Sequence, residues 1–508
     1  MDQLLEKRER RDLKILSLLY SEERWWSAEE LAQRSDCSVG SANKSVSSLS
    51  QMAEHFEHAY EIISQKNRGI ILLASSNYSI SRLESLYYRE TISYQIIDKI
   101  FQSNDLTIEK LMDDLFLSKS TLYRKLKSIE FIFNQNNLEL DKNTLKLKGS
   151  EINIREFFFV FYWSIVKSEE WPFTNIKEEL FSYRLKELSQ ETGLSLSSVE
   201  YIQLQYRMAI NFIQHQKKQF ITELPDIVQL DPYRLAFFSK IGEAMTANVP
   251  PAHKRMEFDY LGLIFSTYPY MPDSPDENYL QKIVDWYQKT NSLTYIITND
   301  FLNQIMARYP EESLTKPLKQ PKVMFMLFST ASYALLFPNL FMQDELTSTW
   351  RKQLKRFEKQ TPNFYQTIKD IVYGIQQSDR YKGKLMHPFY SLYSILSIFS
   401  QNFDLYAFEN TIKLKLICAA DPISENTLSD MLRTRVSQNV IIANSNTRDD
   451  AKVHYDLLLS DIKFAEGQGP LADESYIWDF PPSNRDWNNL DTILNDIIKK
   501  KHLKNETV

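Results

Sequence analysis

The stretch FLSKSTLYRKLKSIE, residues 116–130, combines a helical repeat of apolar residues with a local concentration of positive charge. The apolar residues recur at spacings of four, three and four, which places them on one face of a helix: Leu122, Leu126, Ile129 and Phe133. Ser118 can cap this helix, because its hydroxyl can accept a hydrogen bond from an unpaired amide of the first turn. The stretch therefore predicts an amphipathic helix whose outer face carries Arg124 and Lys127. A solvated surface helix without a ligand would show the same pattern.

A weak internal repeat relates this stretch to a segment 80 residues earlier in the chain. The matched pairs keep their chemical class, as in Ser27 with Thr107, Ser38 with Ser118, Lys44 with Arg124, Leu49 with Ile129 and Gly69 with Gly149. Each copy predicts a short capped helix, a tight turn, a longer second helix and a β-hairpin with basic residues. This order is typical of a winged helix-turn-helix, whose second helix enters the major groove of DNA. The alternative is a pair of packed helical hairpins that bind no nucleic acid.

The candidate DNA contacts are small, hydroxyl-bearing and cationic side chains on the second helices and hairpins. Lys and Arg neutralise phosphates or reach guanine acceptors, and hydroxyl groups can bond to either partner. The first repeat contributes Ser41, Asn43, Lys44, Ser47, Lys66 and Arg68. The second repeat contributes Lys119, Ser120, Thr121, Tyr123, Arg124, Lys127, Lys146 and Lys148. The formal net charge of −6 does not oppose this hypothesis, because DNA binding requires a basic face on one domain only.

The composition predicts a folded, mainly helical chain of several domains. With 508 residues the chain is too long for one core, and its 10 glycines with many Leu, Lys and Glu favour helices. The two cysteines, Cys37 and Cys418, are too few for a disulfide framework or a cysteine zinc site. The charged N-terminus is unlike a signal peptide. Residues 323–343 and 385–403 carry no charge, but buried helices explain them better than membrane spans do. A cytoplasmic protein is expected.

The pattern of segments changes along the chain and predicts five domains. Amphipathic segments rich in Phe, Tyr, Leu and Ile follow the repeat, and the phrase MPDSPDENY divides them. Alternating strands and helices then predict a small α/β domain with a mainly parallel sheet. The expected boundaries are 1–76 and 77–154 for the two winged helix-turn-helix domains, 155–275 and 276–405 for two all-helical domains, and 406–508 for the α/β domain.

This order of parts resembles the Mga/AtxA-type virulence regulators of Gram-positive bacteria. The phrases SEEWPFTNI and LLEKRERRDLKILSLLY also resemble members of that family. The resemblance implies two helical domains similar to phosphotransferase-regulation domains (PRDs) and a C-terminal domain similar to phosphotransferase enzyme IIB. It further implies a transcriptional regulator, in most cases an activator, of virulence or carbohydrate-responsive genes. Such a protein binds double-stranded promoter DNA, forms a homodimer through its C-terminal domain, and is phosphorylated on histidine by HPr, the phosphocarrier of the phosphotransferase system.

His215 and His387 are the candidate phosphorylation sites, one in each helical domain. Neutral imidazole is a good nucleophile near pH 7, and Lys217 and Lys218 beside His215 could hold a phosphate. A purely structural role for either histidine remains the alternative.

Cys418 supports a rival reading of the whole chain. It ends a predicted strand just before a helix, where an enzyme IIB protein places its phosphorylated cysteine, so a phosphocarrier is the alternative function. Asp421 in the next loop would oppose a thiolate or a phosphate, which favours a buried structural cysteine. A third alternative is a scaffold that binds only proteins. No metal site, cofactor motif or catalytic motif is expected.

Overall fold

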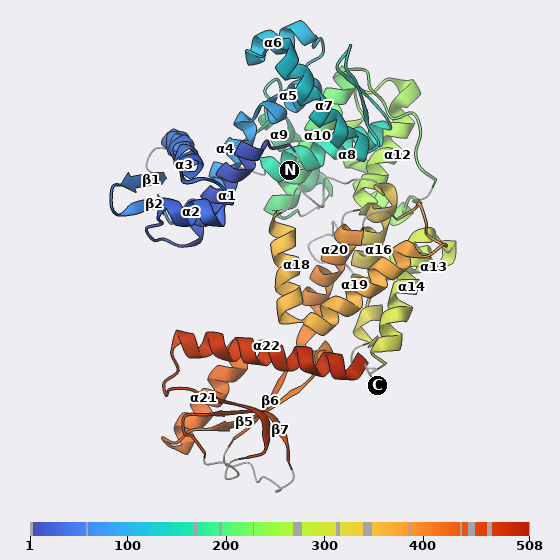
Figure 1. The fold of residues 1–508 in the computed structure, drawn as a ribbon. Helices are drawn as coiled ribbons and strands as arrows, with labels where there is room; N and C mark the ends of the chain where they lie inside the picture. The colour runs from blue at the N-terminus through green and yellow to red at the C-terminus, as the bar shows by residue number, and fades with distance from the viewer. Residues whose placement is uncertain are drawn as a thin grey trace. The chain divides into compact units, whose positions relative to one another are not determined.

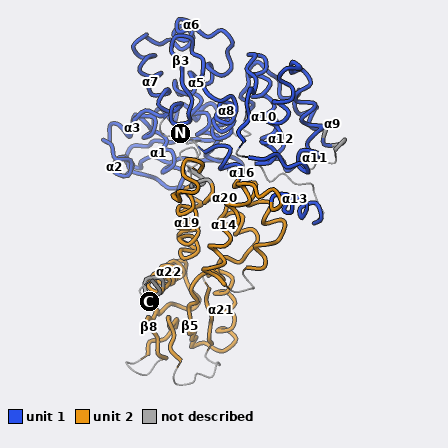
Figure 2. Tube along the Cα trace, turned by 90° about the vertical axis from the view of Figure 1, so that its right-hand side faces the viewer, with its two compact units in different colours: residues 1–287, 332–347 blue, residues 288–331, 348–508 orange. Residues whose placement is uncertain are grey.

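The computed structural model describes residues 4–56, 59–166, 170–192, 196–226, 228–267, 277–310, 315–338, 348–385, 388–436, 439–444, 453–464 and 470–506. The chain forms two compact units, coloured separately in Figure 2. Unit 1 contains Met1–Tyr287 and Ser332–Thr347, and unit 2 contains Gln288–Ala331 and Ser348–Val508. The chain is mainly helical, as the composition predicts, and a small parallel sheet lies near its C-terminus.

Unit 1 begins with three helices and a hairpin (Figure 1). Its elements are α1 (Lys7–Ser21), α2 (Ala28–Arg34), α3 (Val39–Ala53), η1 (Glu54–Phe56), β1 (Tyr60–Gln65) and β2 (Gly69–Ala74). The predicted caps are present, because Ser27 accepts a hydrogen bond from the Glu30 amide and Ser38 accepts one from the Ser41 amide. The apolar stripe of α3 is buried against α1 and α2, which fixes its polar face outward.

The second repeat has the same order of elements. Helix α4 (Ile80–Glu90) leads into α5 (Ile92–Gln102), α6 (Ile108–Leu115), α7 (Lys119–Gln135), β3 (Glu139–Asp141) and β4 (Lys146–Lys148). Thr107 and Ser118 cap α6 and α7 as predicted. Asp36 and Phe116, which match at the 80-residue offset, both adopt a left-handed backbone with φ of 53° and 52°. The turn between the two helices is therefore built in the same way in both repeats.

The remaining elements of unit 1 are helices, beginning with the aromatic helix α8. They are α8 (Glu151–Ile165), α9 (Glu179–Thr192), α10 (Ser198–Gln216), α11 (Pro232–Met245), α12 (Pro251–Thr267) and the start of α13 (Glu277–Thr290). Helix α8 is apolar on nearly all sides, so it is stable only where other helices cover it. Its Phe157 packs against Phe133 of α7 in a tilted arrangement, and its Phe158 stacks on Phe101 of α5, at centroid distances of 5.1 and 4.0 Å. The second repeat is therefore anchored to the helical core of unit 1.

The helical part of unit 2 contains the described residues of the uncharged stretch 385–403 and residues 323–331 of the other uncharged stretch. Its elements are α14 (Leu293–Arg308), η2 (Pro317–Lys319), α16 (Pro321–Leu336), α18 (Ser348–Gln360), α19 (Pro362–Gln377), α20 (Pro388–Asn402) and η3 (Leu405–Phe408), and the last turn of α16 belongs to unit 1. Phe364, Phe399 and Phe408 form one aromatic cluster in this part. In the described part of the chain, no helix has the length and apolar character needed to span a membrane.

The C-terminal part of unit 2 is a four-stranded parallel sheet, as predicted. Its elements are β5 (Ile412–Ile417), α21 (Pro422–Arg435), β6 (Val440–Ala443), β7 (Tyr455–Ser460), β8 (Ala472–Ile477) and α22 (Asn484–Glu506). The strand order is β6-β5-β7-β8, and Leu414 in β5 pairs with Ile442 on one side and Leu457 on the other. The central strands β5 and β7 bury Ile412, Leu414, Leu416, Leu457 and Leu459 in the core of this domain.

Glu409 connects the helical part of unit 2 to this sheet. Its carboxylate accepts hydrogen bonds from the backbone amides of Asn363, at 3.2 Å, and Phe364, at 2.8 Å, in the first turn of α19. Burial raises the pKa of Glu409 to about 7, although the two amide hydrogen bonds act in the opposite direction. The carboxyl group is therefore protonated in the folded chain at pH values where an exposed glutamate is ionised.

We expect the stability of unit 2 to fall as the pH rises through about 7 because of Glu409. The folded pKa lies above the ordinary value of 4.5, so the stabilisation is complete below pH 4.5 and is lost as the pH rises through the folded pKa. Between pH 5 and pH 8 the loss should be roughly 2 kcal/mol relative to Glu409→Gln, which cannot ionise. Denaturant unfolding of both proteins across this range measures the difference. Parallel pH profiles for the two proteins would contradict the prediction.

Candidate nucleic-acid interface

Helix α7 presents the predicted basic face to solvent. Leu122, Leu126 and Ile129 are fully buried, so the side chains between them point outward. The outer face exposes Lys119, Ser120, Tyr123, Arg124 and Lys127. Thr121 is half-buried, because its hydroxyl lies 2.9 Å from that of the capping Ser118. Among the described residues, no carboxylate forms an ion pair with the three cations of this face, so their charge is available to a ligand.

Lys125 is the one lysine of the opening stretch that does not belong to this face. It is 6% exposed, and its ammonium lies 2.9 Å from the Glu6 carboxylate, at the start of α1. The Lys125 hydrogen bond is the main reason why the pKa of Glu6 is lowered. This ion pair connects the two repeats instead of binding a ligand.

Helix α3 has a similar shape but fewer charges. Asn43, Lys44 and Ser47 are exposed, and Ser41 is half-buried because its hydroxyl accepts a hydrogen bond from Ser38 at 2.9 Å. Lys44 is the only cation in the sequence of this helix. The position that matches Lys125 is Ser45, which is buried and donates to the Asp12 carboxylate. The first recognition-helix face is therefore mainly neutral.

The two hairpins place their basic residues differently. Lys66 and Arg68 lie in the turn between β1 and β2, and both are exposed. Lys146 and Lys148 are exposed as well, but they lie within β4, because the second hairpin is shorter and its turn comes earlier. Lys148 also contacts Asp141 at 3.5 Å. The basic residues of the two hairpins therefore match in sequence at the 80-residue offset, but they occupy different positions on the two hairpins.

Two aromatic residues beside these elements were not among the sequence-based candidates. Phe116, in the left-handed turn before α7, is 95% exposed. Trp25, which precedes α2, lies under the guanidinium group of Arg68, 4.5 Å from its ring centroid. Apart from the match of Phe116 to Asp36, nothing in the sequence indicates that Phe116 has a left-handed backbone conformation. The contact of Trp25 joins segments more than 40 residues apart and has no sequence signal.

His215 lies at the end of α10 within a buried network of charges. Its Nε2 atom is 3.2 Å from Oε2 of Glu257, which is also held by Arg155 at 2.6 Å. Lys217 does not face His215; its ammonium donates to the backbone carbonyls of Ile100 and Phe101, and burial lowers its pKa to about 8. Lys218 is exposed.

The second phosphorylation candidate, His387, lies outside the described residues.

Cys418 follows β5 and is surrounded by carboxylates. Its thiol lies 3.6 Å from Asp461, and its backbone amide donates to Glu425 at 3.1 Å. Burial, followed by the charge of Asp461, raises the pKa of the thiol, which opposes a thiolate. Asp421, by contrast, caps α21 through the amides of residues 423 and 424.

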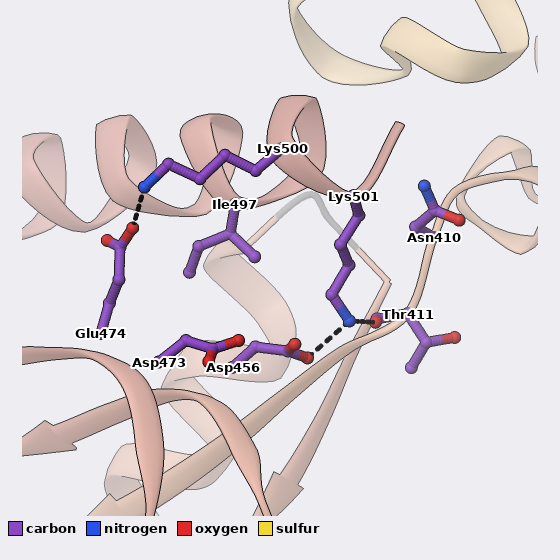
Figure 3. A pocket seen from close by; sticks show the side chains of 8 residues that line it. All are labelled: Asn410, Thr411, Asp456, Asp473, Glu474, Ile497, Lys500 and Lys501. Carbon is purple, nitrogen blue, oxygen red and sulfur yellow. Dashed lines mark hydrogen bonds and ion pairs between the residues drawn. The ribbon is translucent and has the colours of Figure 1, made fainter. Parts of the chain in front are cut away.

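A polar pocket of about 440 Å³ lies at the opposite edge of the sheet, beneath the end of α22 (Figure 3). Lys501 points to Asp456, at 2.7 Å, and to the carbonyl of Thr411, and Lys500 points to Glu474. The two lysines of the pocket are therefore paired with carboxylates of the pocket itself. Within the described ranges, no group of three His, Cys, Asp or Glu side chains could hold a metal ion.

Comparison with known proteins places the basic face of α7 within a known DNA-binding domain family. Residues 76–162 match the family model of the Mga helix-turn-helix domain, and this range contains the whole second repeat. The chain is 23% identical over 312 residues to the capsule synthesis positive regulator AcpB of Bacillus anthracis, which covers 59% of this chain and 62% of AcpB. It is 22% identical over 375 residues to a putative trans-acting regulator of Streptococcus pneumoniae, which covers 73% of each chain.

A third relative is the anthrax toxin expression trans-acting positive regulator of Bacillus anthracis, 26% identical over 177 residues, or 34% of this chain and 36% of that protein. The chain spans 62% of the length of AcpB and of the related AcpA. The resemblance inferred from the sequence is confirmed: the chain contains an Mga helix-turn-helix domain and is similar, over more than half of its length, to Gram-positive virulence regulators of the Mga/AtxA type.

Proposed function

We propose that this chain is a transcriptional regulator, an activator in the manner of its named relatives, that binds double-stranded promoter DNA. The observation that carries the proposal is the exposed basic face of α7, formed by Lys119, Arg124 and Lys127 within the segment that matches the Mga helix-turn-helix domain. Among the residues that the structure describes, no carboxylate pairs with these three cations. A helix with this face fits the major groove, where its cations reach phosphates and base edges. The hairpins β1–β2 and β3–β4 serve as wings, so that residues 1–76 and 77–154 form two winged helix-turn-helix domains.

The direct test is binding of the full chain to promoter fragments across a salt series. Lys and Arg that bind phosphates displace condensed counterions, so log affinity should fall linearly with log salt, by about 0.9 for each phosphate contact. Electrophoretic mobility shift and fluorescence anisotropy measure this slope. An affinity that does not change with salt would reject the proposal.

We further propose that residues 406–508 hold two copies of the chain together. The sheet leaves two edge strands, and Ile441 on β6 and Ile477 on β8 are 59% and 48% exposed. Unpaired edges with exposed apolar side chains favour pairing with another chain. A homodimer would place four DNA-binding domains on one operator.

Light scattering of edge variants tests this assembly. Ile441→Lys or Ile477→Lys is expected to shift the mass of the full chain toward one copy, depending on which edge pairs, because a lysine opposes pairing of edges. Ile423→Lys, at an apolar position on α21 that is 79% exposed, is the control and should leave the mass unchanged. If neither edge variant alters a dimeric mass, the interface lies elsewhere.

Control by the phosphotransferase system completes the proposal, with residues 155–275 and 276–405 as PRD-like domains and HPr as the phosphoryl donor. His215 is the site we assign in the first of them, because a charge added at its Nε2 atom would be opposed by the Glu257 carboxylate and would disturb the ion pair with Arg155. Incubation of the chain with the general phosphotransferase proteins and labelled phosphoenolpyruvate tests the site. Acid-labile label that is lost in His215→Ala would support it, and a chain without label would reject it.

A further inference from the structure

We propose that the two repeats contact DNA through different elements: the first through Arg68 in its wing, held in place by Trp25, and the second through helix α7. Trp25 is then a positioning residue for the DNA contact of the first repeat. This inference rests on the proposed function and adds the division of labour between the repeats.

The backbone brings Trp25 to the wing. The amide of Trp26 donates to the carbonyl of Ile70 at 2.7 Å, and the amide of Ile70 donates back to Trp26 at 2.8 Å, so one antiparallel bridge joins the segment before α2 to the hairpin. Gly69 permits this approach. Its φ is +108°, and a Cβ atom at this position would overlap the carbonyl oxygen of Trp26. The close contact places the neighbouring residues Trp25 and Arg68 side by side.

The contact prepares Arg68 for an anionic ligand. Its guanidinium carbon lies 4.5 Å from the centroid of the Trp25 ring, within the range of a cation–π interaction. Stacking uses the face of the guanidinium group and leaves its N–H donors, which lie in the plane, free to bind a phosphate. Arg68 is exposed, and in the described part of the chain no carboxylate is paired with it or with the neighbouring Lys66. A held arginine loses less side-chain entropy on binding than a free one does.

The second repeat lacks this arrangement. At the 80-residue offset, Asp105 stands in place of Trp25 and Lys148 in place of Arg68. Lys148 contacts Asp141 at 3.5 Å, and Lys142 in the turn is paired with Glu130 at 2.7 Å. The charges of the second wing are therefore partly neutralised within the protein.

The recognition helices show the opposite distribution. Helix α7 exposes Lys119, Arg124 and Lys127, whereas α3 has Lys44 as its only cation. The positive charge of the first repeat is thus concentrated on the wing, and that of the second repeat on the helix. The two repeats therefore offer DNA different contact elements, a wing in the first repeat and a helix in the second.

The experiment measures DNA affinity and its salt slope for full-length variants. Arg68→Ala should weaken binding at least roughly fivefold and lower the slope by about 0.9, as expected for one lost phosphate contact. Trp25→Leu should weaken binding roughly two- to fivefold, which is the effect of an exposed cation–π contact. Trp25→Phe, which keeps an aromatic face, should restore most of the affinity. In the Arg68→Ala background, Trp25→Leu should have no further effect.

Several outcomes would overturn the inference. Unchanged binding by Arg68→Ala would remove the wing contact, and an undiminished effect of Trp25→Leu in the Arg68→Ala background would assign Trp25 a structural role. Thermal midpoints identify variants that do not fold. If Trp25→Leu does not fold, the separate variants Arg68→Ala and Trp25→Phe decide whether the wing contacts DNA. The proposed function fails separately: in that case the wild-type chain shows no salt-dependent binding. If the wild type binds and the α7 variants weaken it while Arg68→Ala does not, only the inference about the wing fails.

Discussion

Replacing Arg124 and Lys127 together by alanine is expected to weaken DNA binding by roughly 2–6 kcal/mol, about 1–3 kcal/mol for each side chain. Both are exposed on α7, and in the described part of the chain neither forms an ion pair with a carboxylate, so the substitutions should cost little stability. The salt slope should fall by roughly 2 if both bind phosphates, and specificity should relax at any base pair that Arg124 reads. Anisotropy titrations at several salt concentrations measure both quantities.

The matched control for this pair is Lys254→Ala with Lys499→Ala. These lysines are exposed on α12 and α22, outside both repeats in the sequence, and the double variant has the same net charge as the α7 variant. Its affinity should remain close to that of the wild type. Equal losses in the two double variants would show that only overall charge matters. Equal thermal midpoints would show that the α7 variant remains folded, since its substitutions lie outside the core.

Arg155→Met is expected to destabilise unit 1 by roughly 3–5 kcal/mol, because it leaves a buried carboxylate without its counterion. Arg155 and Glu257 are each 1% exposed and are joined by two hydrogen bonds, at 2.6 and 2.8 Å. Arg155 also binds the Glu151 carboxylate at 2.9 Å, and Glu257 accepts the Ile221 amide at 2.8 Å. Denaturant unfolding of the variant and the wild type measures the loss.

A second ion pair on α12 provides the control. Arg255 contacts Asp259 at 2.7 Å, but its side chain is 77% exposed, so Arg255→Ala should cost less than about 1 kcal/mol. The double variant Arg155→Met/Glu257→Leu should recover part of the stability, since it removes the unpaired charge as well. A loss for Arg155→Met as small as that for Arg255→Ala would contradict the prediction.

The buried pair of Arg155 and Glu257 also makes the stability of unit 1 depend on pH in the acid range. Burial opposes ionisation of Glu257, but the hydrogen bonds from His215 and Arg155 prevail and lower its pKa to about 2. A folded pKa below the ordinary 4.5 means that the stabilisation is present above pH 4.5 and is lost as the pH falls toward 2. The sign is opposite to that expected for Glu409 in unit 2.

The sequence was sufficient for features that depend on neighbouring residues. The capping serines, the apolar spacing of α3 and α7 and the repeat all follow from local hydrogen bonding and helical periodicity. The parallel sheet followed from the alternation of strands and helices along the sequence. Strand β8 (Ala472–Ile477) has a weaker signal in the sequence than the central strands. Its side chains alternate between half-buried and exposed, and ADESYI therefore lacks the apolar run of a central strand.

Only the tertiary structure decided which charged and aromatic side chains are available to a ligand. Lys125 and Lys127 lie in the same short basic stretch, yet Lys125 is buried against Glu6 and Lys127 is free in solvent. Lys217, expected beside a phosphate, instead binds two backbone carbonyls of α5, and Trp25 lies under an arginine more than 40 residues further along the chain. The physical reason is common to these cases: helical periodicity fixes the face on which a side chain lies, but its partner comes from a distant segment that is placed there only when the core packs.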